Sequence, residues 1–164
     1  EPVQVVHRPP PPPPTPTPTP GPKLTRAQAL ANAAERGKVL WKQDDPRDKL
    51  LLWISVQKKF VMLYRVADGS LTEYKEFLKM VGRKDVTANG LAYGTDSVWA
   101  ATSKGAFVFD RRTRAWSQLV INLDFDLLEA HVEKVELKGN ALTFTVKDKG
   151  TYQQDLKTKS WKKL

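Results

Sequence analysis

The sequence contains no cysteine and only two histidines, His7 and His131, among its 164 residues. Without cysteine, neither a disulfide nor a thiolate metal site can form. The two histidines lie far apart in the chain, and neither stands in a metal-binding or catalytic motif. We therefore expect no metal site and no bound cofactor.

The sequence also lacks the short motifs of common catalytic sites. No serine stands in a Gly-x-Ser-x-Gly turn, and no glycine-rich phosphate loop is present. Asp124, Asp126 and Glu129 resemble a carboxylate cluster, but acid–base catalysis needs buried, coupled carboxylates beside a substrate pocket, and nothing in the sequence places them there. Asp44 and Asp45 could hold a cation, although a solvated turn is the simpler interpretation. The sequence thus predicts a protein that is not an enzyme.

Long apolar runs are missing as well, since none reaches the roughly 18 residues that a membrane-spanning helix needs. The start shows no initiator methionine and no signal-like segment, so we expect Glu1 to be a processed or excised N-terminus. The length suits one domain plus a tail, with 40% apolar and 27% charged residues. The formal net charge of +9 permits contact with nucleic acid, acidic lipid or an acidic protein surface.

Proline is abundant at the N-terminus, where residues 9–14 are all proline and Thr-Pro alternation follows up to residue 20. This composition predicts a polyproline II rod that reaches on the order of 40 Å. We interpret residues 1–22 as a semi-rigid arm between the domain and an anchor or partner. A ligand for an aromatic groove and a glycosylated stalk are the alternatives. The candidate arm contacts are Pro9, Pro10, Pro16, Pro18 and Pro20.

Thr-Pro alternation of this kind is frequent in bacterial cell-envelope tethers. We therefore expect a periplasmic, cell-envelope or secreted protein, with the cytoplasm as the alternative location.

Residues 23–37 predict one short helix. Thr25 suits the N-cap, residues 26–36 are rich in alanine, and Gly37 suits the C-cap. The apolar side of this helix is thin, and we expect it to pack lightly on the domain or a partner through Ala27, Leu30, Ala31 and Ala34.

Two segments 45 positions apart, residues 94–119 and 139–164, share one plan of strand, turn, strand, turn and aromatic strand. Each ends on Asp-x-x-Thr-x-x-Trp-x-x-Leu, with a glycine five residues before the aspartate that suits a hairpin turn with positive φ. The aspartate can accept a hydrogen bond from the backbone two residues on, and the tryptophan starts a fourth strand and buries its ring. At this spacing, Trp99 corresponds to Phe144 and Ala101 to Val146.

A fainter copy precedes these two segments. Residues 50–56 and 60–66 look like two strands, and Asp68 is followed by Tyr74 and Phe77 at the spacing of the tryptophan and leucine in the later copies. This copy lacks the threonine and the hairpin glycine.

A period of about 40–45 residues with four short strands per unit is typical of a β-propeller blade. The run at residues 98–110, VWAATSKGAFVFD, resembles the blade motif of the two-component-regulator type of propeller. The resemblance covers residues 86–164 well and residues 50–77 weakly. It implies an all-β fold of four-stranded antiparallel blades. In that family such propellers lie outside the cytoplasmic membrane and report ligand binding to a kinase, but a fold alone does not assign a function.

Residues 38–164 leave room for about three blades, at 38–80, 86–122 and 132–164, whereas closed propellers have about four to eight. We therefore expect an incomplete or open ring, completed by further chain, by other copies, or by a partner that covers its edges. Within these blades we expect a turn at Asn89-Gly90 and a connector at residues 120–128. Residues 77–81 either finish the first blade or form a helical turn.

Basic residues gather in two equivalent turns, which successive blades would place on one face. This predicts a candidate surface for an acidic partner, with binding that weakens as salt rises. Ordinary solvated turns are the alternative. The candidate residues are Arg111, Arg112, Arg114, Lys157 and Lys159.

Taken together, these features predict a non-enzymatic binding, scaffold or accessory subunit that docks on a larger assembly through its β domain and arm. We expect a protein partner, and a homo-oligomer is the other assembly considered. An extracytoplasmic ligand-sensing propeller is the first alternative, and a binder of nucleic acid or another acidic surface is the second.

Overall fold

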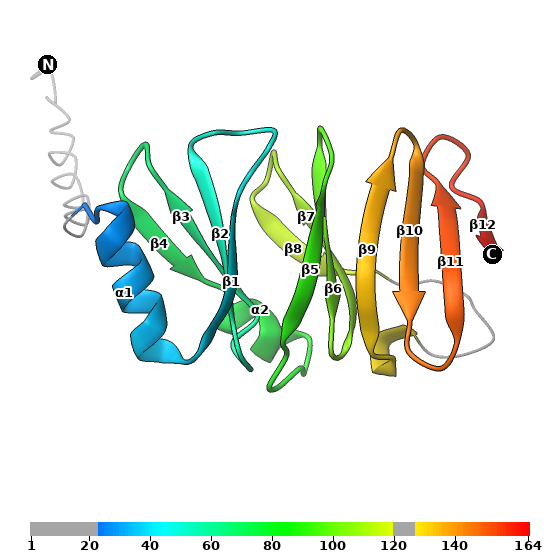
Figure 1. Ribbon diagram of the computed structural model, residues 1–164, viewed down its shortest axis with the longest axis horizontal. Coiled ribbons are helices and arrows are strands. Elements are labelled where there is room, and N and C mark those ends of the chain that lie inside the picture. Colours follow the sequence, from blue (N-terminus) through cyan, green and yellow to red (C-terminus); the bar gives the residue numbers. More distant parts are fainter. Residues whose placement is uncertain (1–22, 120–126) are drawn as a thin grey trace, which may run out of the picture.

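A computed structural model describes residues 23–119 and 127–164 of the chain. These residues form three four-stranded antiparallel sheets that stand side by side in a row (Figure 1). The first sheet contains β1 (Val39–Asp44), β2 (Leu51–Val56), β3 (Val61–Arg65) and β4 (Ser70–Glu73). The second contains β5 (Ala88–Tyr93), β6 (Ser97–Thr102), β7 (Gly105–Asp110) and β8 (Ala115–Gln118). The third contains β9 (Val132–Lys138), β10 (Ala141–Val146), β11 (Gly150–Asp155) and β12 (Trp161–Lys163).

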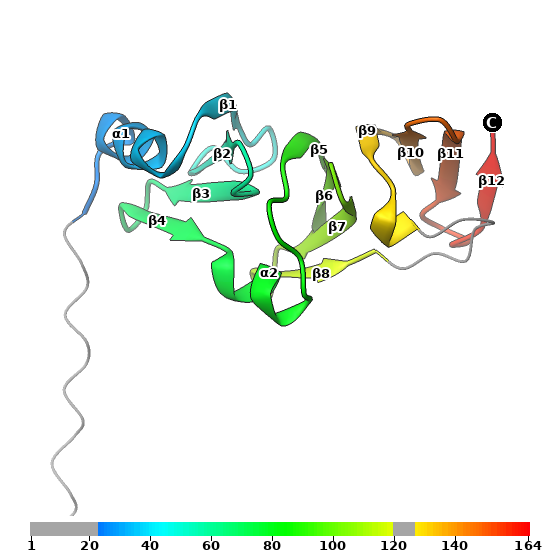
Figure 2. The same ribbon diagram turned by 90° about the horizontal axis from the view of Figure 1, so that it is seen from below.

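Each sheet is a simple meander in which strands that are adjacent in the chain pair with each other. The described helices are α1 (Arg26–Arg36), α2 (Lys75–Met80) and the short 3₁₀ helix η1 (Leu127–Glu129). The described sheets do not close into a ring (Figure 2). The expected all-β fold with about three four-stranded blades in an open arrangement is therefore confirmed.

Two apolar interfaces hold the row together. Between the first and second sheets, Trp53, Phe60, Phe109 and Trp116 form an aromatic cluster with ring centroids 4.8–5.9 Å apart. Between the second and third sheets, Trp99 packs against side chains that include Leu142, Phe144 and Tyr152. Burial of this much aromatic surface is the main stabilising contribution in such a fold.

The turn chemistry of the repeat is confirmed. In the β7–β8 turn, the Asp110 carboxylate accepts hydrogen bonds from the backbone N–H groups of Arg112 (2.8 Å) and Thr113 (3.2 Å). In the β11–β12 turn, the carboxylate of Asp155 accepts the equivalent pair at the same two distances. The hairpin glycines Gly105 and Gly150 have φ values of 95° and 102°, which side chains rarely allow.

The predicted correspondence of Trp99 with Phe144 and of Ala101 with Val146 is wrong by one residue. Phe144 pairs with Tyr152 in the third sheet as Ala100 pairs with Phe107 in the second, so Phe144 corresponds to Ala100. The β10–β11 hairpin holds one residue more than the β6–β7 hairpin, and a shift of one residue turns a strand's side chains to the opposite face.

Phe60 occupies the hairpin position that glycine fills in the other two sheets. Its φ is 63°, and its backbone N–H donates to the carbonyl of Val86 at 2.7 Å. The backbone N–H of Gly105 donates to the carbonyl of Ala130, also at 2.7 Å. This bond joins the second sheet to the segment before the third, as the bond of Phe60 joins the first sheet to the segment before the second. The phenyl ring is fully buried, so its burial offsets the strain of the left-handed backbone.

α1 covers the outer face of the first sheet, where a preceding blade would otherwise pack (Figures 1 and 2). The helix begins after Thr25, as expected, with a capping box between Thr25 and Gln28. Of the expected contact residues, Leu30 packs against the sheet. The other three are wrong, because Ala27, Ala31 and Ala34 are exposed and Ala29 and Ala33 are buried instead. These two small residues let the helix approach Leu52, Ile54, Met62 and Tyr64 of the sheet.

The outer face of the third sheet is polar. β10 alternates, with Leu142, Phe144 and Val146 buried against the second sheet, and with Thr143 and Thr145 half-buried on the opposite face. Trp161 is half-buried beside Phe144, whereas its equivalent Trp116 is buried. The outer face therefore offers no apolar surface of the kind that the two interfaces between sheets bury.

The predicted turn at Asn89-Gly90 is wrong, since both residues lie within β5. The pairing of β5 with β6 shifts there, so Asn89 is the extra residue of a β-bulge. Similar shifts make Leu40 an extra residue in β1 and Glu133 one in β9. The bulge is thus a feature of all three first strands.

The segment after the first sheet forms α2, which settles the alternatives left open for residues 77–81. The proposed match of Tyr74 and Phe77 with the tryptophan and leucine of the later copies is wrong. Leu71 pairs with Tyr64 as Trp116 pairs with Phe109, so Leu71 takes the tryptophan position. Tyr74 and Phe77 instead pack across the junction of the first two sheets, against Trp116 and Phe107 respectively.

Candidate protein-binding surfaces

The first strands of the three sheets, β1, β5 and β9, lie along one side of the row (Figure 2). One hollow of about 230 Å³ lies between β1 and β5, and another of about 490 Å³ lies between β5 and β9. Both are lined by Leu91 and Tyr93, so they form one surface that crosses all three sheets. We call it the inner-strand groove.

Half-buried apolar side chains from each sheet line the inner-strand groove: Trp41, Leu91, Tyr93 and Leu137. The basic residues on it are Lys42, Arg47 and Lys138. The groove therefore combines aromatic and aliphatic contact area with positive charge, a combination suited to a protein segment rather than to a small polar metabolite.

The groove is held in shape by bonds between sheets. The Trp41 Nε1–H and the Ser55 hydroxyl both donate to the carbonyl of Ala88, at 3.1 and 2.9 Å. Asn89 Nδ2 donates to the carbonyl of Val132 at 2.7 Å. Burial, with a smaller contribution from the Asp45 carboxylate, raises the pKa of Tyr93 well above its usual value. The phenol therefore stays neutral and can both donate and accept a hydrogen bond.

The predicted basic turns, at residues 111–114 and 156–159, lie at the same edge of neighbouring sheets, the upper edge in Figure 1. Arg112, Arg114, Lys157 and Lys159 are exposed there. Arg114 and Lys159 both have positive φ, at 58° and 64°. Their contact with an acidic partner stays a prediction.

Arg111 differs from the other four, because it forms an ion pair inside the molecule. Its guanidinium donates two hydrogen bonds to the carboxylate of Asp45, at 2.8 and 3.1 Å, and a third to the carbonyl of Gly94. The Asp45 side chain is fully buried and also accepts from Trp53 Nε1 at 3.0 Å. Burial alone would raise the pKa of Asp45, but the bonds from Arg111 and Trp53 outweigh it and lower the pKa.

This pair could not be predicted from local patterns, because Asp45 and Arg111 stand 66 positions apart, in turns of two different sheets. The cation that Asp45 holds is a guanidinium. Its neighbour Asp44 pairs with Arg26 of α1 at 2.6 Å.

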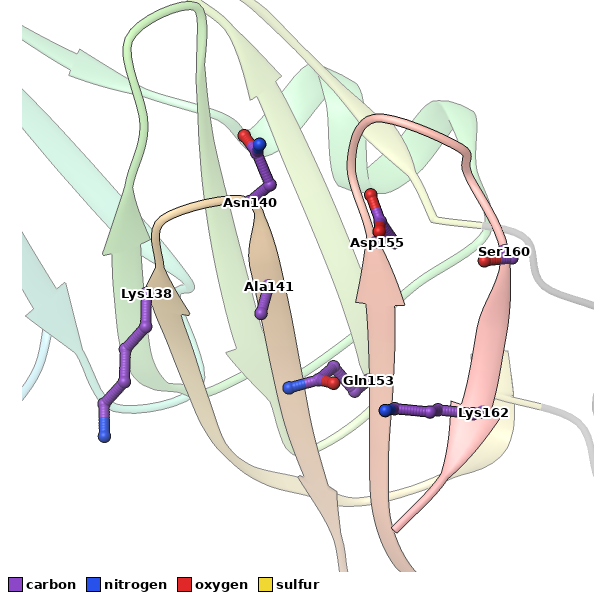
Figure 3. Close-up of a pocket in the computed structure, with 7 residues that line it drawn as sticks. All are labelled: Lys138, Asn140, Ala141, Gln153, Asp155, Ser160 and Lys162. Carbon is purple, nitrogen blue, oxygen red and sulfur yellow. The ribbon is translucent and has the colours of Figure 1, made fainter.

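A third hollow, of about 360 Å³, lies on the outer face of the third sheet (Figure 3). Its lining is polar, with Lys138, Gln153 and Lys162 spread across the strands. The Asp155 carboxylate on its rim is already occupied by two backbone N–H groups of its own turn. This arrangement is a solvated sheet surface with little to hold a ligand.

The remaining candidate residues do not come together in the described part of the chain. Glu129 pairs with Arg83 at 2.8 Å, while Asp124 and Asp126 lie outside the described residues. His131 is exposed beside Asn89, and His7 and the candidate arm prolines also fall outside. Within residues 23–119 and 127–164, no three His, Cys, Asp or Glu side chains are placed to hold a metal ion. Neither described α-helix has the length and apolarity to cross a membrane.

Comparison with protein-family models finds no match, and comparison with curated proteins also finds none. Solved structures do match the fold. The extracellular domain of BT3049, a putative hybrid two-component system of B. thetaiotaomicron, has a TM-score of 0.56 at 18% identity, over 73% of this chain and 17% of its own. Sqt1 of Saccharomyces cerevisiae has a TM-score of 0.57 at 10% identity, over 80% of this chain and 36% of its own.

YCF48 of Cyanidioschyzon merolae has a TM-score of 0.55 at 13% identity, over 77% of this chain and 37% of its own. A structure of YCF48 bound to D1 peptide also matches, with a TM-score of 0.54 at 14% identity, over 76% of this chain and 42% of its own. The chain thus spans less than half the length of each of these β-propeller proteins. Its three sheets have the fold of successive β-propeller blades.

Proposed function

We propose that this chain is a non-enzymatic protein-binding module that docks a segment of a partner protein in the inner-strand groove. The observation that carries the proposal is the lining of that groove. Trp41, Leu91 and Tyr93 present half-buried rings and aliphatic surface to solvent, and Arg47 and Lys138 stand beside them. Buried aromatic anchors surrounded by polar groups are what protein recognition uses most.

The mode of binding follows from the edges of the sheets. β1, β5 and β9 are each the first strand of their sheet, so one edge of each has no partner strand in the described residues. Each also carries a bulge, which interrupts the row of free backbone groups and discourages strand addition. We therefore propose that side chains in the groove, more than added backbone pairing, select the partner.

The YCF48 structure supports this proposal, because a protein with blades of this fold is seen there with a bound peptide. We further propose a location in the periplasm or cell envelope, which the match to the extracellular domain of BT3049 supports. We also propose that residues 1–22 tether the domain, as part of a scaffold or accessory subunit. Arg112, Arg114, Lys157 and Lys159 form a further proposed contact surface.

A selection of displayed peptides on the purified chain tests the groove. Peptides enriched on the wild type are remade and their affinity measured by titration calorimetry. Leu91→Glu puts a charge into the centre of the groove and should weaken binding by at least about tenfold. Val66→Glu, at an exposed apolar residue of the β3–β4 turn, should leave the affinity unchanged.

Two results would contradict the proposal. One is a selection that enriches no peptide above background. The other is a set of peptides that bind Leu91→Glu as tightly as the wild type, in a protein whose circular dichroism shows it folded.

A further inference from the structure

α2 lies on the opposite side of the row from β1, β5 and β9 (Figure 2). A second concave surface lies beside this helix. It has a volume of about 440 Å³ and is lined by the β2–β3 hairpin, the end of β4, α2 and the connector that follows it. We call it the α2 hollow. Its lining contains six cations and two carboxylates, and the cations are Lys58, Lys59, Lys75, Lys79, Arg83 and Lys84.

The two carboxylates of the hollow, Glu73 and Asp85, leave most of this charge uncompensated. Glu73 is shared between Lys75 at 3.1 Å and Arg36 of α1 at 3.0 Å. No ion pair joins Lys58, Lys59, Lys79 or Lys84 to a carboxylate of the described residues. The ammonium of Lys104 adds further charge nearby, since it donates to the backbone carbonyl of Lys84.

The acidic side chains of the molecule are concentrated elsewhere. At the opposite edge, Asp45 pairs with Arg111, Asp44 with Arg26, and Asp68 with Arg65. Three of the cations there are balanced by these neighbours, and the exposed Arg112, Arg114, Lys157 and Lys159 stand on turns. The unpaired cations of the α2 hollow surround a concavity instead. Uncompensated charge around a concavity draws a ligand of opposite sign.

The hollow also has features that a plain positive surface lacks. Leu78 of α2 belongs to the core, but its 9% exposed surface is an apolar part of the lining. Arg83 is only 13% exposed, and although Nη1 reaches Glu129, its buried Nε–H has no acceptor in the described part of the chain. A buried donor without an acceptor costs free energy, and a guanidinium in the lining of a hollow suits a carboxylate ligand.

The elements around the hollow are held firmly in place. Phe77 of α2 packs edge-on against Phe107, with 5.6 Å between the ring centroids. Tyr74 packs in the same way against Trp116, with 6.1 Å between the centroids. The hairpin is joined to the connector by a bond from the Lys58 backbone N–H to Thr87 Oγ1 at 2.9 Å. The cations therefore project from a preformed frame, which lowers the ordering cost of binding.

We infer that the α2 hollow binds an acidic segment of a partner protein, with Asp or Glu side chains beside the lysines and one apolar side chain on Leu78. This surface is separate from the inner-strand groove and does not depend on the function proposed for it. A hollow of this size takes single side chains, whereas a membrane needs a flat face and a nucleic acid a longer basic track.

The test uses a short fluorescent peptide of Glu and Asp around one central leucine, with its Gln/Asn equivalent as the uncharged control. Binding is followed by anisotropy at low salt. The double variant Lys58→Glu/Lys79→Glu should weaken binding by at least about tenfold. The matched control Lys49→Glu/Lys162→Glu makes the same change in net charge at two exposed lysines that line neither the α2 hollow nor the inner-strand groove, and it should leave most of the affinity. Replacing the central leucine by serine should also weaken binding.

The inference is overturned if the acidic peptide does not bind, or if both double variants lose affinity equally, which would mean attraction by net charge alone. It is also overturned if anionic phosphatidylserine vesicles or duplex DNA bind more tightly than the peptide with the same dependence on Lys58 and Lys79. The Leu91→Glu variant should bind the acidic peptide normally, which separates this result from the outcome for the groove.

Discussion

At the scale of single residues, the contact between Asp45 and Arg111 links the first sheet to the second. Both partners are largely withdrawn from water, and Trp53 and two backbone N–H groups complete the bonding of the carboxylate. A buried pair of this kind contributes little compared with an apolar replacement, but the loss of one partner leaves the other charge uncompensated.

Asp45→Ala should therefore lower the free energy of unfolding by about 3 kcal/mol. The neighbouring Asp44→Ala is the control, because the side chains of its ion pair are exposed, Arg26 by 50% and Asp44 by 59%. Loss of this pair should lower the free energy of unfolding by less than about 1 kcal/mol. Urea denaturation of both variants measures the difference. Equal losses would show that Asp45 is no more important than a surface carboxylate.

The same carboxylate predicts a dependence on pH. Its pKa is lower in the folded chain than in the unfolded one, so its contribution is complete above the unfolded pKa of about 3.9. The contribution disappears as the pH falls through the lower, folded pKa. The stability gap between the wild type and Asp45→Ala should thus be constant from neutral pH to about pH 5 and shrink below about pH 4. Denaturant titrations across this range measure it, and a gap that widens in acid would refute the assignment.

Phe60 offers a test of backbone strain against side-chain burial. Truncation to alanine should cost about 3 kcal/mol, because the ring packs between Phe107 and Trp116. Phe60→Gly removes the same ring but suits the φ of 63°, so it should be about 1 kcal/mol more stable than Phe60→Ala. If chemical denaturation finds alanine more stable than glycine here, the left-handed conformation is not present in solution.

At the scale of elements, α1 takes the place of a neighbouring blade. It covers Leu52, Ile54 and Met62, and it is fixed by the Tyr64 hydroxyl, which donates to the carbonyl of Leu24 at 2.7 Å. Without α1, the first sheet would present this apolar face to solvent, and exposed faces of that kind promote association.

Ala33→Glu should detach α1, because the residue is fully buried against the sheet. We expect a loss of at least about 2 kcal/mol in stability together with a rise in native mass from self-association. Ala34→Glu, one position along, lies on the exposed side and should change neither. Light scattering of both variants measures the mass. A monomeric Ala33→Glu protein of normal stability would mean that α1 is not a structural cover.

The elements show how far the sequence alone could predict the fold. Turn residues such as Asp110 and Gly105 act locally, so their pattern was sufficient to predict the hairpins and the blade repeat. The one-residue change between the β6–β7 and β10–β11 hairpins was hidden because the flanking motif kept its 45-residue spacing. In α1, alanines on every side left no stripe to show that Ala29 and Ala33 face the sheet.

The candidate surfaces were less predictable from the sequence, because they form only where different sheets and helices pack together. Arg111 and Arg112 look alike in sequence, yet only Arg111 meets a carboxylate from another sheet. The inner-strand groove and the α2 hollow each draw residues from segments far apart in the chain. Such surfaces depend on how blades and helices stack, and local patterns carry no information about that.

At the scale of the whole molecule, three blades form an open row whose two outer faces differ from its internal interfaces. α1 covers the first face and polar side chains occupy the last. The first strands are then available on one side and α2 projects on the other (Figure 2). On this basis we propose a binding module with two surfaces of different chemistry, one aromatic and aliphatic and the other basic.

Hydrogen–deuterium exchange, measured with and without a peptide selected on the chain, tests whether the inner-strand groove is the binding surface. We expect slower exchange on binding in residues 41–43, 89–93 and 135–138, which come from β1, β5 and β9 and line the groove. Exchange in the outer strands β4, β8 and β12 should stay the same. Protection confined to those outer strands or to the basic turns, with none in the first strands, would contradict it.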